Sequence, residues 1–381
     1  LLSDLSSAAV EAAWIQKQLE REKEKLVKDP PVGVGTGALS RLSREVGDAG
    51  DYVESVALTL SLLSSEDDPR HAPTARWVSR DARGAVEVHA SPVDASGWLA
   101  SHLWRPAFGA VAVSATLRAM GEFRHFAERS GLSRVDDVTF AALPSPFDLE
   151  GQAVLRVPAM VSDPSSEDEY IAEVMMELEE SLDPAEGTLI LCASAVLMEA
   201  VVDRLPASLK DRVKVQGSKS IGALLDDHRR DVAAGSGSIL VGLATLAEGV
   251  DLPGRQCSHV VIVKLPFMSP NDPVSETRSE WLTGQGRSPF VEILLPDAHR
   301  RLVQACGRLV RTETDAGRIT VLDQRLLTKT YGRRMLETLP PYRRDIGQVA
   351  DRPPPRPVQT RAYSGRSVPS RVTSRRTRQL R

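Results

Sequence analysis

The chain has 381 residues, of which 41% are hydrophobic and 26% are charged, and its formal net charge is -3. This length and balance exclude a wholly disordered chain and allow two or three globular units. The sequence has no run of about 18 apolar residues and no charged-then-apolar leader, which excludes a transmembrane span and a secretory signal. A cytoplasmic protein is therefore expected.

The three cysteines, Cys192, Cys257 and Cys306, are far apart in sequence and lie in apolar or strand-like stretches. Their spacing does not match a zinc or iron–sulfur site, so we expect small buried thiols in a reducing compartment. The first residue is Leu1, where a natural start would give Met. We therefore expect the chain to be a fragment of a longer protein.

The N-terminal region predicts two helices. In residues 8–28, apolar side chains recur at helical spacing beside a charge run over residues 20–25, which indicates a solvated face. Two prolines and three glycines then interrupt the pattern, and a second apolar stripe follows over residues 53–63. Two stripes with a break between them predict a helical hairpin over about residues 1–70.

After Pro73, short β-branched runs alternate with helical patterns, which is typical of a parallel sheet covered by helices. The predicted strands are residues 110–113, 189–192, 213–215, 239–243, 260–263 and 319–322. The predicted helices between them are residues 197–205, 221–234 and 298–310.

The C-terminal end, from about Gln348, is rich in Pro, Ser and Arg, with nine arginines and no acid from Arg352 onward. Such a segment cannot bury a core, so a disordered tail is expected. Its charges favour contacts with nucleic-acid phosphates, and a solubilising extension is the alternative.

The most specific signal is the series Gln304, Arg308 and Arg311, with Gly307 between them. On a continuous helix these three positions project from one face and span roughly 10 Å at about 1.5 Å per residue. The face lies between an apolar stripe and a buried-type strand, and Gly307 is expected to allow a close approach there. Rigidly held guanidinium groups suit the charge that develops during phosphoryl transfer, and a structural arginine ladder is the alternative.

A second pattern follows the strand at residues 239–243, where the next loop carries Glu248, Gly249 and Asp251. In parallel sheets, ligands bind beyond the carboxyl ends of the strands, so this loop is a candidate ligand site. A tight turn with surface acids is the alternative.

Two further strands end in hydroxyl side chains. Residues 110–113 lead to Ser114 and Thr116, and residues 189–192 lead to Ser194. Each pattern is weak alone, because serine and threonine at strand ends also cap helices. Their order and separation along the chain are the informative part.

This ordered set resembles motifs III, IV, V and VI of superfamily 2 helicases. The forms Ser145-Pro-Phe-Asp148, Val215-Gln-Gly217 and Trp281-Leu282 look like the DinG branch of the XPD-like group. The resemblance covers about residues 75–345. It implies an α/β fold, in which a RecA-like helicase lobe with a parallel sheet is preceded by a helical arch and followed by a disordered basic tail.

The resemblance also implies a division of the chain. The expected parts are an arch-like segment at residues 1–72, the end of a first RecA-like lobe with motif III at 73–140, a second lobe with motifs IV to VI at 141–346, and the tail at 347–381.

In the family, the whole enzyme is a 5′-to-3′ DNA helicase that hydrolyses ATP between two lobes while single-stranded DNA crosses both. The resemblance implies that Arg308 and Arg311 reach the γ-phosphate and that Gln304 positions the attacking water or a phosphate oxygen. The remaining implied roles are nucleotide coupling by Glu248, Gly249 and Asp251, lobe linkage by Ser114 and Thr116, and DNA-backbone contact by Ser194, Gln216 and Thr245.

The sequence departs from the family in what it lacks: a Gly-x-x-x-x-Gly-Lys-Ser/Thr loop, an Asp-Glu-x-His motif and the iron–sulfur cysteines of many relatives. In the family these lie upstream of the arch. ATP and Mg²⁺ are therefore expected to bind mainly on a missing N-terminal lobe, where a 4Fe-4S cluster remains possible, and this chain alone is expected to be inactive. The expected partners are single-stranded DNA and duplex junctions, with no membrane and a monomeric state. A non-hydrolysing DNA-binding scaffold and an RNA-directed or nuclease-fused relative remain as alternatives.

Overall fold

The computed structural model describes residues 2–68, 70–81, 83–268, 272–347 and 378–379, without the side chains of Glu248, Arg378 and Gln379. The chain divides into two compact units. The first comprises Leu1–Gly97, Pro270–Ser288 and Arg366–Arg381, and the second comprises Trp98–Ser269 and Pro289–Gly365. Most of the predicted tail, residues 348–377 and 380–381, lies outside the described residues.

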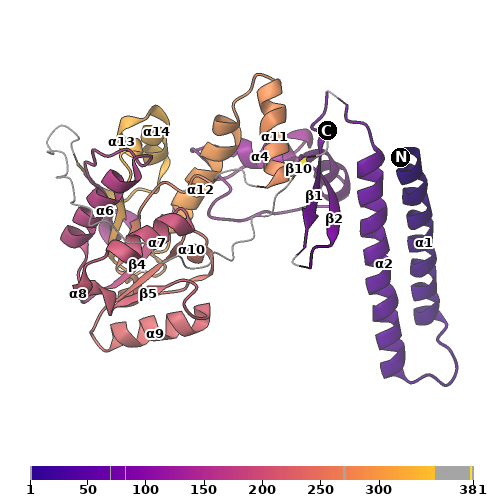
Figure 1. Ribbon diagram of the computed structural model, residues 1–381, viewed down its shortest axis with the longest axis horizontal. Coiled ribbons are helices and arrows are strands. Elements are labelled where there is room, and N and C mark those ends of the chain that lie inside the picture. The colour runs from indigo at the N-terminus through magenta and orange to yellow at the C-terminus, as the bar shows by residue number, and fades with distance from the viewer. Residues whose placement is uncertain (1, 69, 82, 269–271, 348–377, 380–381) are drawn as a thin grey trace. The chain divides into compact units, whose positions relative to one another are not determined.

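The first unit is built on a hairpin of two long helices, which confirms the helical prediction. α1 spans Leu2–Lys28 and α2 spans Thr36–Ser64, and Figure 1 shows them running side by side. The helices approach closely, because a Cβ atom at Gly50 of α2 would lie 4.0 Å from the Cβ atom of Leu19. The charge run at residues 20–25 is exposed and its ion pairs stay within α1, as a solvated face requires.

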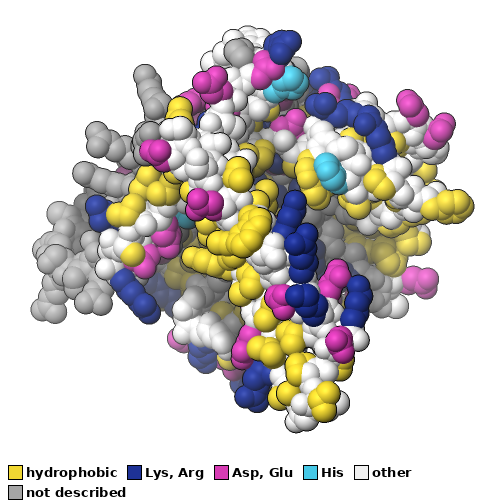
Figure 2. Space-filling view, turned by 90° about the vertical axis from the view of Figure 1, so that its right-hand side faces the viewer, with side chains coloured by type: hydrophobic (Ala, Val, Ile, Leu, Met, Phe, Trp, Pro, Cys, Tyr) yellow, Lys and Arg dark blue, Asp and Glu magenta, His cyan; other side chains and the backbone are white. Residues whose placement is uncertain are grey.

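A small antiparallel sheet and a further helix complete this unit. The strands are β1 (Thr74–Arg80), β2 (Val86–Pro92) and β10 (Arg378–Gln379), in the order β10-β1-β2. Helix α11 (Pro273–Gly284) packs against β1. Figure 2 shows acidic and basic side chains interspersed with hydrophobic ones on the face that it draws.

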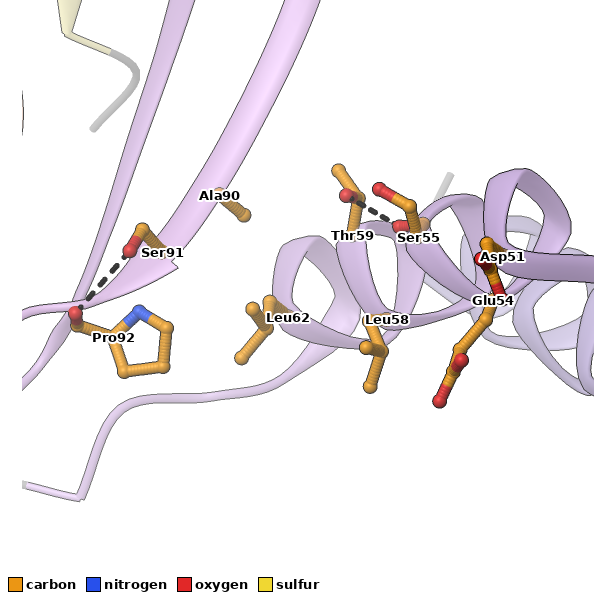
Figure 3. A pocket seen from close by; sticks show the side chains of 9 residues that line it. All are labelled: Asp51, Glu54, Ser55, Leu58, Thr59, Leu62, Ala90, Ser91 and Pro92. Atoms are coloured by element: carbon orange, nitrogen blue, oxygen red, sulfur yellow. Dashed lines mark hydrogen bonds between the residues drawn. The ribbon is translucent and has the colours of Figure 1, made fainter. Parts of the chain in front are cut away.

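A cavity of about 520 Å³ lies between α2 and β2 in the first unit. Leu58 and Leu62 form part of its wall, and Asp51 and Glu54 stand along the same helix (Figure 3). Its lining residues include these two carboxylates but no lysine or arginine. Because a phosphate needs cationic or N–H donors, this cavity is poorly suited to a nucleotide.

The second unit holds a seven-stranded, wholly parallel sheet in the order β5-β6-β4-β7-β8-β3-β9. The strands are β3 (Ala153–Val157), β4 (Gly187–Cys192), β5 (Val213–Val215), β6 (Ser238–Leu243), β7 (His259–Ile262), β8 (Gly317–Val321) and β9 (Arg343–Ile346). A parallel sheet with connecting helices was expected from the sequence, and the α/β fold is confirmed.

Helices cover both faces of this sheet, so its strands are buried on both sides. Along β4, Leu189 packs in the core beneath α9 and α12, whereas its neighbour Ile190 packs beneath α6 and α7. The longer helices are α4 (Arg124–Ser130), α6 (Glu167–Ser181), α7 (Ala195–Arg204), α9 (Ile221–Ala233), α12 (Leu295–Cys306) and α14 (Thr330–Thr338). Short turns of helix are α3 (Ser96–Leu99), α5 (Leu149–Gln152), α8 (Ala207–Lys210), α10 (Leu246–Gly249), α13 (Arg325–Thr328), η1 (Ala100–Trp104), η2 (Leu132–Arg134), η3 (Gly254–Cys257) and η4 (Phe290–Leu294).

One predicted strand is wrong. Residues 110–113 form no ladder with any described strand, and Val111 and Val113 are 89% and 88% exposed. A β-branched run becomes a strand only when a neighbouring strand supplies its hydrogen-bond partners. The described part of this chain supplies none there.

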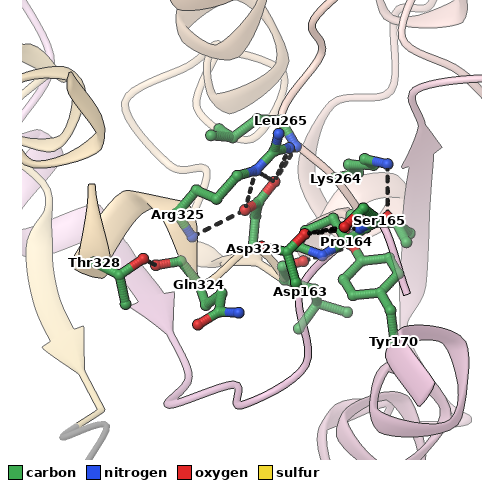
Figure 4. A network of polar contacts seen from close by, with 12 residues as sticks. Asp163, Pro164, Ser165, Tyr170, Lys264, Leu265, Asp323, Gln324, Arg325 and Thr328 are labelled. Atoms are coloured by element: carbon green, nitrogen blue, oxygen red, sulfur yellow. Dashed lines mark hydrogen bonds and ion pairs between the residues drawn. The ribbon is translucent and has the colours of Figure 1, made fainter. Parts of the chain in front are cut away.

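A polar network joins the carboxyl ends of β7 and β8 (Figure 4). The fully buried Asp323 accepts hydrogen bonds from the backbone N–H of Leu265 at 2.9 Å and from Arg325 Nη2 at 2.6 Å. The guanidinium also lies over the ring of Phe267, 5.3 Å from its centroid. The Tyr170 hydroxyl donates to the carbonyl of Leu322 at 2.7 Å. Together these contacts fix the loops that leave the two strands.

All three cysteines are buried, as expected, and burial raises the pKa of each thiol to about 12. None of the helices in the described ranges has the length and hydropathy that a membrane span needs.

Two buried histidines make stability depend on pH. Burial lowers the pKa of His259 to about 3, with help from the charges of Arg318 and Arg156, and burial lowers the pKa of His299 to about 4. In the unfolded chain both titrate near 6.5. Between these values the unfolded state binds more protons, so stability is full above about pH 6.5 and falls as the pH drops.

We expect each of these two histidines to add up to about 1.4 kcal/mol per pH unit to the slope of unfolding free energy below pH 6.5. Urea unfolding of the wild type and of His259→Gln at pH 7, 6 and 5 measures this slope. The variant should have the shallower slope, and a control change at the exposed His102 should leave it unchanged. Equal slopes for wild type and His259→Gln would contradict the assignment.

Candidate functional site

The helix that carries Gln304 ends earlier than its sequence pattern predicts. α12 stops at Cys306, and Arg308 and Arg311 lie in the turns that follow. The prediction that all three side chains project from one helix face is therefore wrong. Gly307 continues with φ -67°, and a Cβ atom there would meet Val303 O at an ordinary 3.4 Å, so the close approach expected at Gly307 is absent.

The two arginines converge on the loop that follows β6. Arg311 donates from Nη1 to the Asp251 carboxylate and from Nη2 to the Val250 carbonyl. Arg308 Nη1 lies 3.4 Å from the same Val250 carbonyl oxygen. The Arg311 side chain is 18% exposed, whereas that of Asp251 is 77% exposed. The structure thus places a guanidinium just beneath a surface carboxylate.

Asp315 ties the two loops together. Its carboxylate accepts hydrogen bonds from the backbone N–H groups of Arg311 and Thr312 at 2.8 Å each and from that of Gly254 at 2.9 Å. Burial raises the pKa of Asp315, but these hydrogen bonds outweigh it and hold the pKa below the ordinary value. The side chain is therefore an anion that fixes the backbone on either side of Arg311.

A second contact joins the predicted motif III to α12. Gln304 Nε2 donates to Thr116 Oγ1 at 3.3 Å, and the backbone N–H of Thr116 donates to Ser114 Oγ at 3.2 Å. Thr116 is half-buried and Ser114 is exposed. The two segments are 188 residues apart in the chain, and the sequence pattern did not predict their contact.

The candidate DNA-contact residues lie at the carboxyl ends of three adjacent strands. Ser194 follows β4, Gln216 follows β5 and Thr245 follows β6. Ser194 caps α7 by accepting from the N–H of Leu197 at 3.2 Å, and Gln216 Oε1 accepts from the N–H of Leu243 at 2.8 Å. Thr245 is exposed at the start of α10 and makes no capping bond.

The two groups of residues lie at opposite ends of the sheet. Asp251 and Gly254 precede β7, and Arg311 and Asp315 precede β8, so they meet at the amino ends of two neighbouring parallel strands. A strand of four to six residues separates the ends by roughly 13–20 Å. Gly249 is exposed at the end of α10, and Glu248 lies in the same helix, with its side chain outside the described atoms.

Sequence reasoning missed two parts of this arrangement. It assigned no role to Asp315, although an acid four residues after Arg311 is a pattern that a loop-closing carboxylate would produce. It could not find the Val250 carbonyl, because a backbone acceptor leaves no mark in the side-chain pattern.

Known proteins match this chain along most of its length. Residues 178–342 match the family described as the helicase C-terminal domain. The ATP-dependent DNA helicase DinG of Photobacterium profundum is 35% identical over 309 residues, which cover 79% of this chain and 44% of that protein. The protein of the same name from Escherichia coli (strain K12) is 36% identical over 287 residues, covering 74% and 40%.

Among solved structures, one titled XPD_Helicase is 16% identical, with a TM-score of 0.48 and coverage of 91% of this chain and 64% of that one. The chain spans less than half the length of the curated relatives named above. Their identity, the matched helicase domain and the parallel sheet agree with the resemblance seen in the sequence motifs. The chain is homologous to the DinG helicases over most of its length, and residues 178–342, most of which lie in the second unit, match the helicase C-terminal domain.

Proposed function

We propose that this chain supplies the arginine-bearing motor lobe of an ATP-dependent DNA helicase that moves 5′ to 3′ on single-stranded DNA. The observation that carries the proposal is the Arg311 guanidinium, which is held between the Val250 carbonyl and the exposed Asp251 carboxylate. A planar cation near the surface suits a phosphate, since it can exchange carboxylate oxygens for phosphate oxygens.

The bound nucleotide, with Mg²⁺, would supply the phosphoryl group, and both would be held mainly by a lobe outside this chain. In this scheme Arg308 and Arg311 stabilise charge on the transferred group, and Gln304 orients a water or a phosphate oxygen. Asp251 competes with the nucleotide for Arg311, so the position of the loop at Glu248 and Gly249 depends on the nucleotide state. That competition would link hydrolysis to lobe movement.

We assign single-stranded DNA to the opposite end of the sheet. Thr245 is exposed there, and Ser194 and Gln216 order the first residues after their strands. Hydroxyl, amide and backbone N–H groups at such places bind phosphate and sugar without reading sequence. The proposed DNA site at the carboxyl ends of the strands and the arginines at the amino ends are then separate. A motor that hydrolyses ATP at one place and moves DNA at another requires this separation.

The exposed valines at residues 110–113 fit the same proposal. An unpaired β-branched segment with exposed apolar side chains can pair its backbone groups and cover its side chains by lying beside another strand. We propose that the first motor lobe of the longer protein supplies that strand, and that Ser114 and Thr116 then lie between the lobes. In the cell, we propose a monomeric, cytoplasmic enzyme that acts on duplex junctions in DNA repair or replication. A 4Fe-4S cluster, where present, would belong to the part of the protein outside this chain.

Measurement of ATP turnover with and without single-stranded DNA tests the proposal. The complete protein should hydrolyse ATP in the usual range of about 1 per second or faster when DNA is present. This chain alone should hydrolyse no more than buffer, because its sequence lacks the phosphate-binding loop. Turnover by the isolated chain, or a complete protein that binds DNA without hydrolysing ATP, would overturn the proposal and favour a different role.

A further inference from the structure

The segment after Thr116 makes a tight turn that is buried against the second unit's core. Ala119 and Glu122 exchange backbone hydrogen bonds of 2.9 and 3.0 Å. The two residues between them both have positive φ, 53° at Met120 and 82° at Gly121. This is a two-residue hairpin turn that strongly favours glycine or asparagine. Methionine in the left-handed region is strained, so surrounding contacts must hold it there.

One buried side chain, His299 of α12, supplies the polar contact that holds the turn. The backbone N–H of Met120 donates to His299 Nδ1 at 3.2 Å, and His299 Nε2 lies 2.9 Å from Thr338 Oγ1. The hydroxyl of Thr338, at the end of α14, is also 2.8 Å from the Arg334 carbonyl. His299 is 2% exposed. Nδ1 accepts a hydrogen bond from Met120, and Nε2 faces a hydroxyl oxygen that can accept one. These two contacts fit the neutral tautomer that carries its proton on Nε2.

We propose that His299 is a positioning residue that anchors the segment linking motif III to the second lobe, and so keeps Thr116 within reach of Gln304. Met120 is four residues after Thr116, and an extended chain of that length spans at most about 14 Å. With Met120 fixed to α12 through His299, Thr116 stays within about 14 Å of Met120 and therefore near the helix that carries Gln304. The coupling role rests on the proposed function, whereas the anchor itself does not.

Other contacts at the turn are weaker anchors. Arg334 pairs with Glu122, but both side chains are 55% exposed, and exposed ion pairs contribute little. Arg118 donates to the carbonyl of Gly121 within the turn itself, at 2.6 Å from Nη2, and so does not tie it to either helix. The buried imidazole is the polar group that connects the turn to both α12 and α14.

Two substitutions of His299 test the contributions of its two ring nitrogens separately. In His299→Asn the amide oxygen can take the place of Nδ1 and accept from Met120, whereas in His299→Gln the terminal amide takes the place of Nε2 and reaches only Thr338. Amide hydrogen exchange of this chain reports the anchor directly. We expect exchange at Met120 and across residues 114–122 to rise about tenfold in His299→Gln, as for the loss of one hydrogen bond. His299→Asn should stay within about threefold of the wild type.

A matched control separates anchoring from general destabilisation. His228 is a buried histidine of the same unit that contacts the Gln256 carbonyl at 2.7 Å, far along the chain from the turn. His228→Leu should leave exchange at residues 114–122 unchanged relative to strand β4. Wild-type protection of Met120 in His299→Gln, equal loss in His228→Leu, or a proton on Nδ1 in the imidazole ¹⁵N spectrum at pH 7 would overturn the anchor.

The coupling role has its own readout in the complete enzyme. His299→Gln should lower the DNA-stimulated kcat for ATP several-fold with little change in the KM for ATP, and His299→Asn should restore it. Normal kcat in a variant whose turn has lost protection would reject the coupling while leaving the anchor intact. Failure of the proposed function would show differently, as the absence of ATP turnover in the wild-type enzyme.

Discussion

Replacing Arg308 or Arg311 with alanine in the complete enzyme should lower ATP turnover about 10³-fold and leave affinity for single-stranded DNA nearly unchanged. The reason is geometric: both guanidinium groups converge at the amino ends of β7 and β8, whereas the candidate DNA residues lie at the carboxyl ends of the sheet. Steady-state ATP hydrolysis at saturating DNA, together with a DNA-binding titration, measures the two effects separately.

Lysine is the matched control for this prediction. Arg311→Lys keeps the charge but cannot reach Asp251 and the Val250 carbonyl at once, because an ammonium group lacks the planar fork. Turnover should therefore stay low in the lysine variant. If both alanine variants hydrolyse ATP at the wild-type rate, the arginines only hold the two loops together and their assigned role is wrong.

Replacing Arg325 with leucine should destabilise the second unit by about 3–5 kcal/mol. Arg325 covers the fully buried Asp323, to which it donates from Nη2 at 2.6 Å, and the variant leaves a buried carboxylate without its cation (Figure 4). Equilibrium unfolding in urea measures the change in free energy.

The control is a pair of the same kind at the surface. Arg124 and Glu128 on α4 lie 2.8 Å apart with side chains 68% and 47% exposed. Arg124→Ala should leave the free energy of unfolding nearly unchanged, because exposed ion pairs contribute little. If Arg325→Leu and Arg124→Ala lowered the free energy of unfolding by similar amounts, burial of Asp323 would not be the reason for the stabilisation by the Arg325 pair.

The elements that the sequence predicted correctly are those whose pattern is local. The stripes of α1 and α2 recur at helical spacing, and the buried runs of β4, β6 and β7 are apolar on both faces, so period and length identify them. The bounds of these three strands differ from the predictions by two residues at most, whereas α2 begins at Thr36, well before the predicted stripe at residues 53–63. The parallel arrangement followed from the alternation of such strands with helices.

The errors arise where a distant partner decides the outcome. The valines at 110–113 have a strand's composition, yet strand formation depends on a neighbour that the described chain does not provide. The apolar pattern at residues 298–310 continues past Cys306, but the helix ends there because the following residues turn toward Val250 and Asp315. The helical period alone does not show this end, but Gly307 at the C-cap was an available signal, since glycine often follows the last residue of a helix.

The site was predicted as a set of residues, and the structure adds which of them meet. Arg308, Arg311 and Asp251 come together, and Gln304 meets Thr116. Asp315 and His299 act on backbone N–H groups, so their importance depends on a conformation that side-chain patterns do not encode. The roles assigned to the predicted residues stay predictions until turnover and DNA binding are measured.

The most direct test of the account is ATP turnover on single-stranded DNA after this chain is combined with a first motor lobe from the same protein. We expect that neither part hydrolyses ATP alone, that the wild-type pair does so with DNA stimulation, and that a pair containing the Arg311→Ala chain is about 10³-fold slower. Equal turnover by the wild-type and Arg311→Ala pairs would contradict the claim that this chain supplies the catalytic arginine.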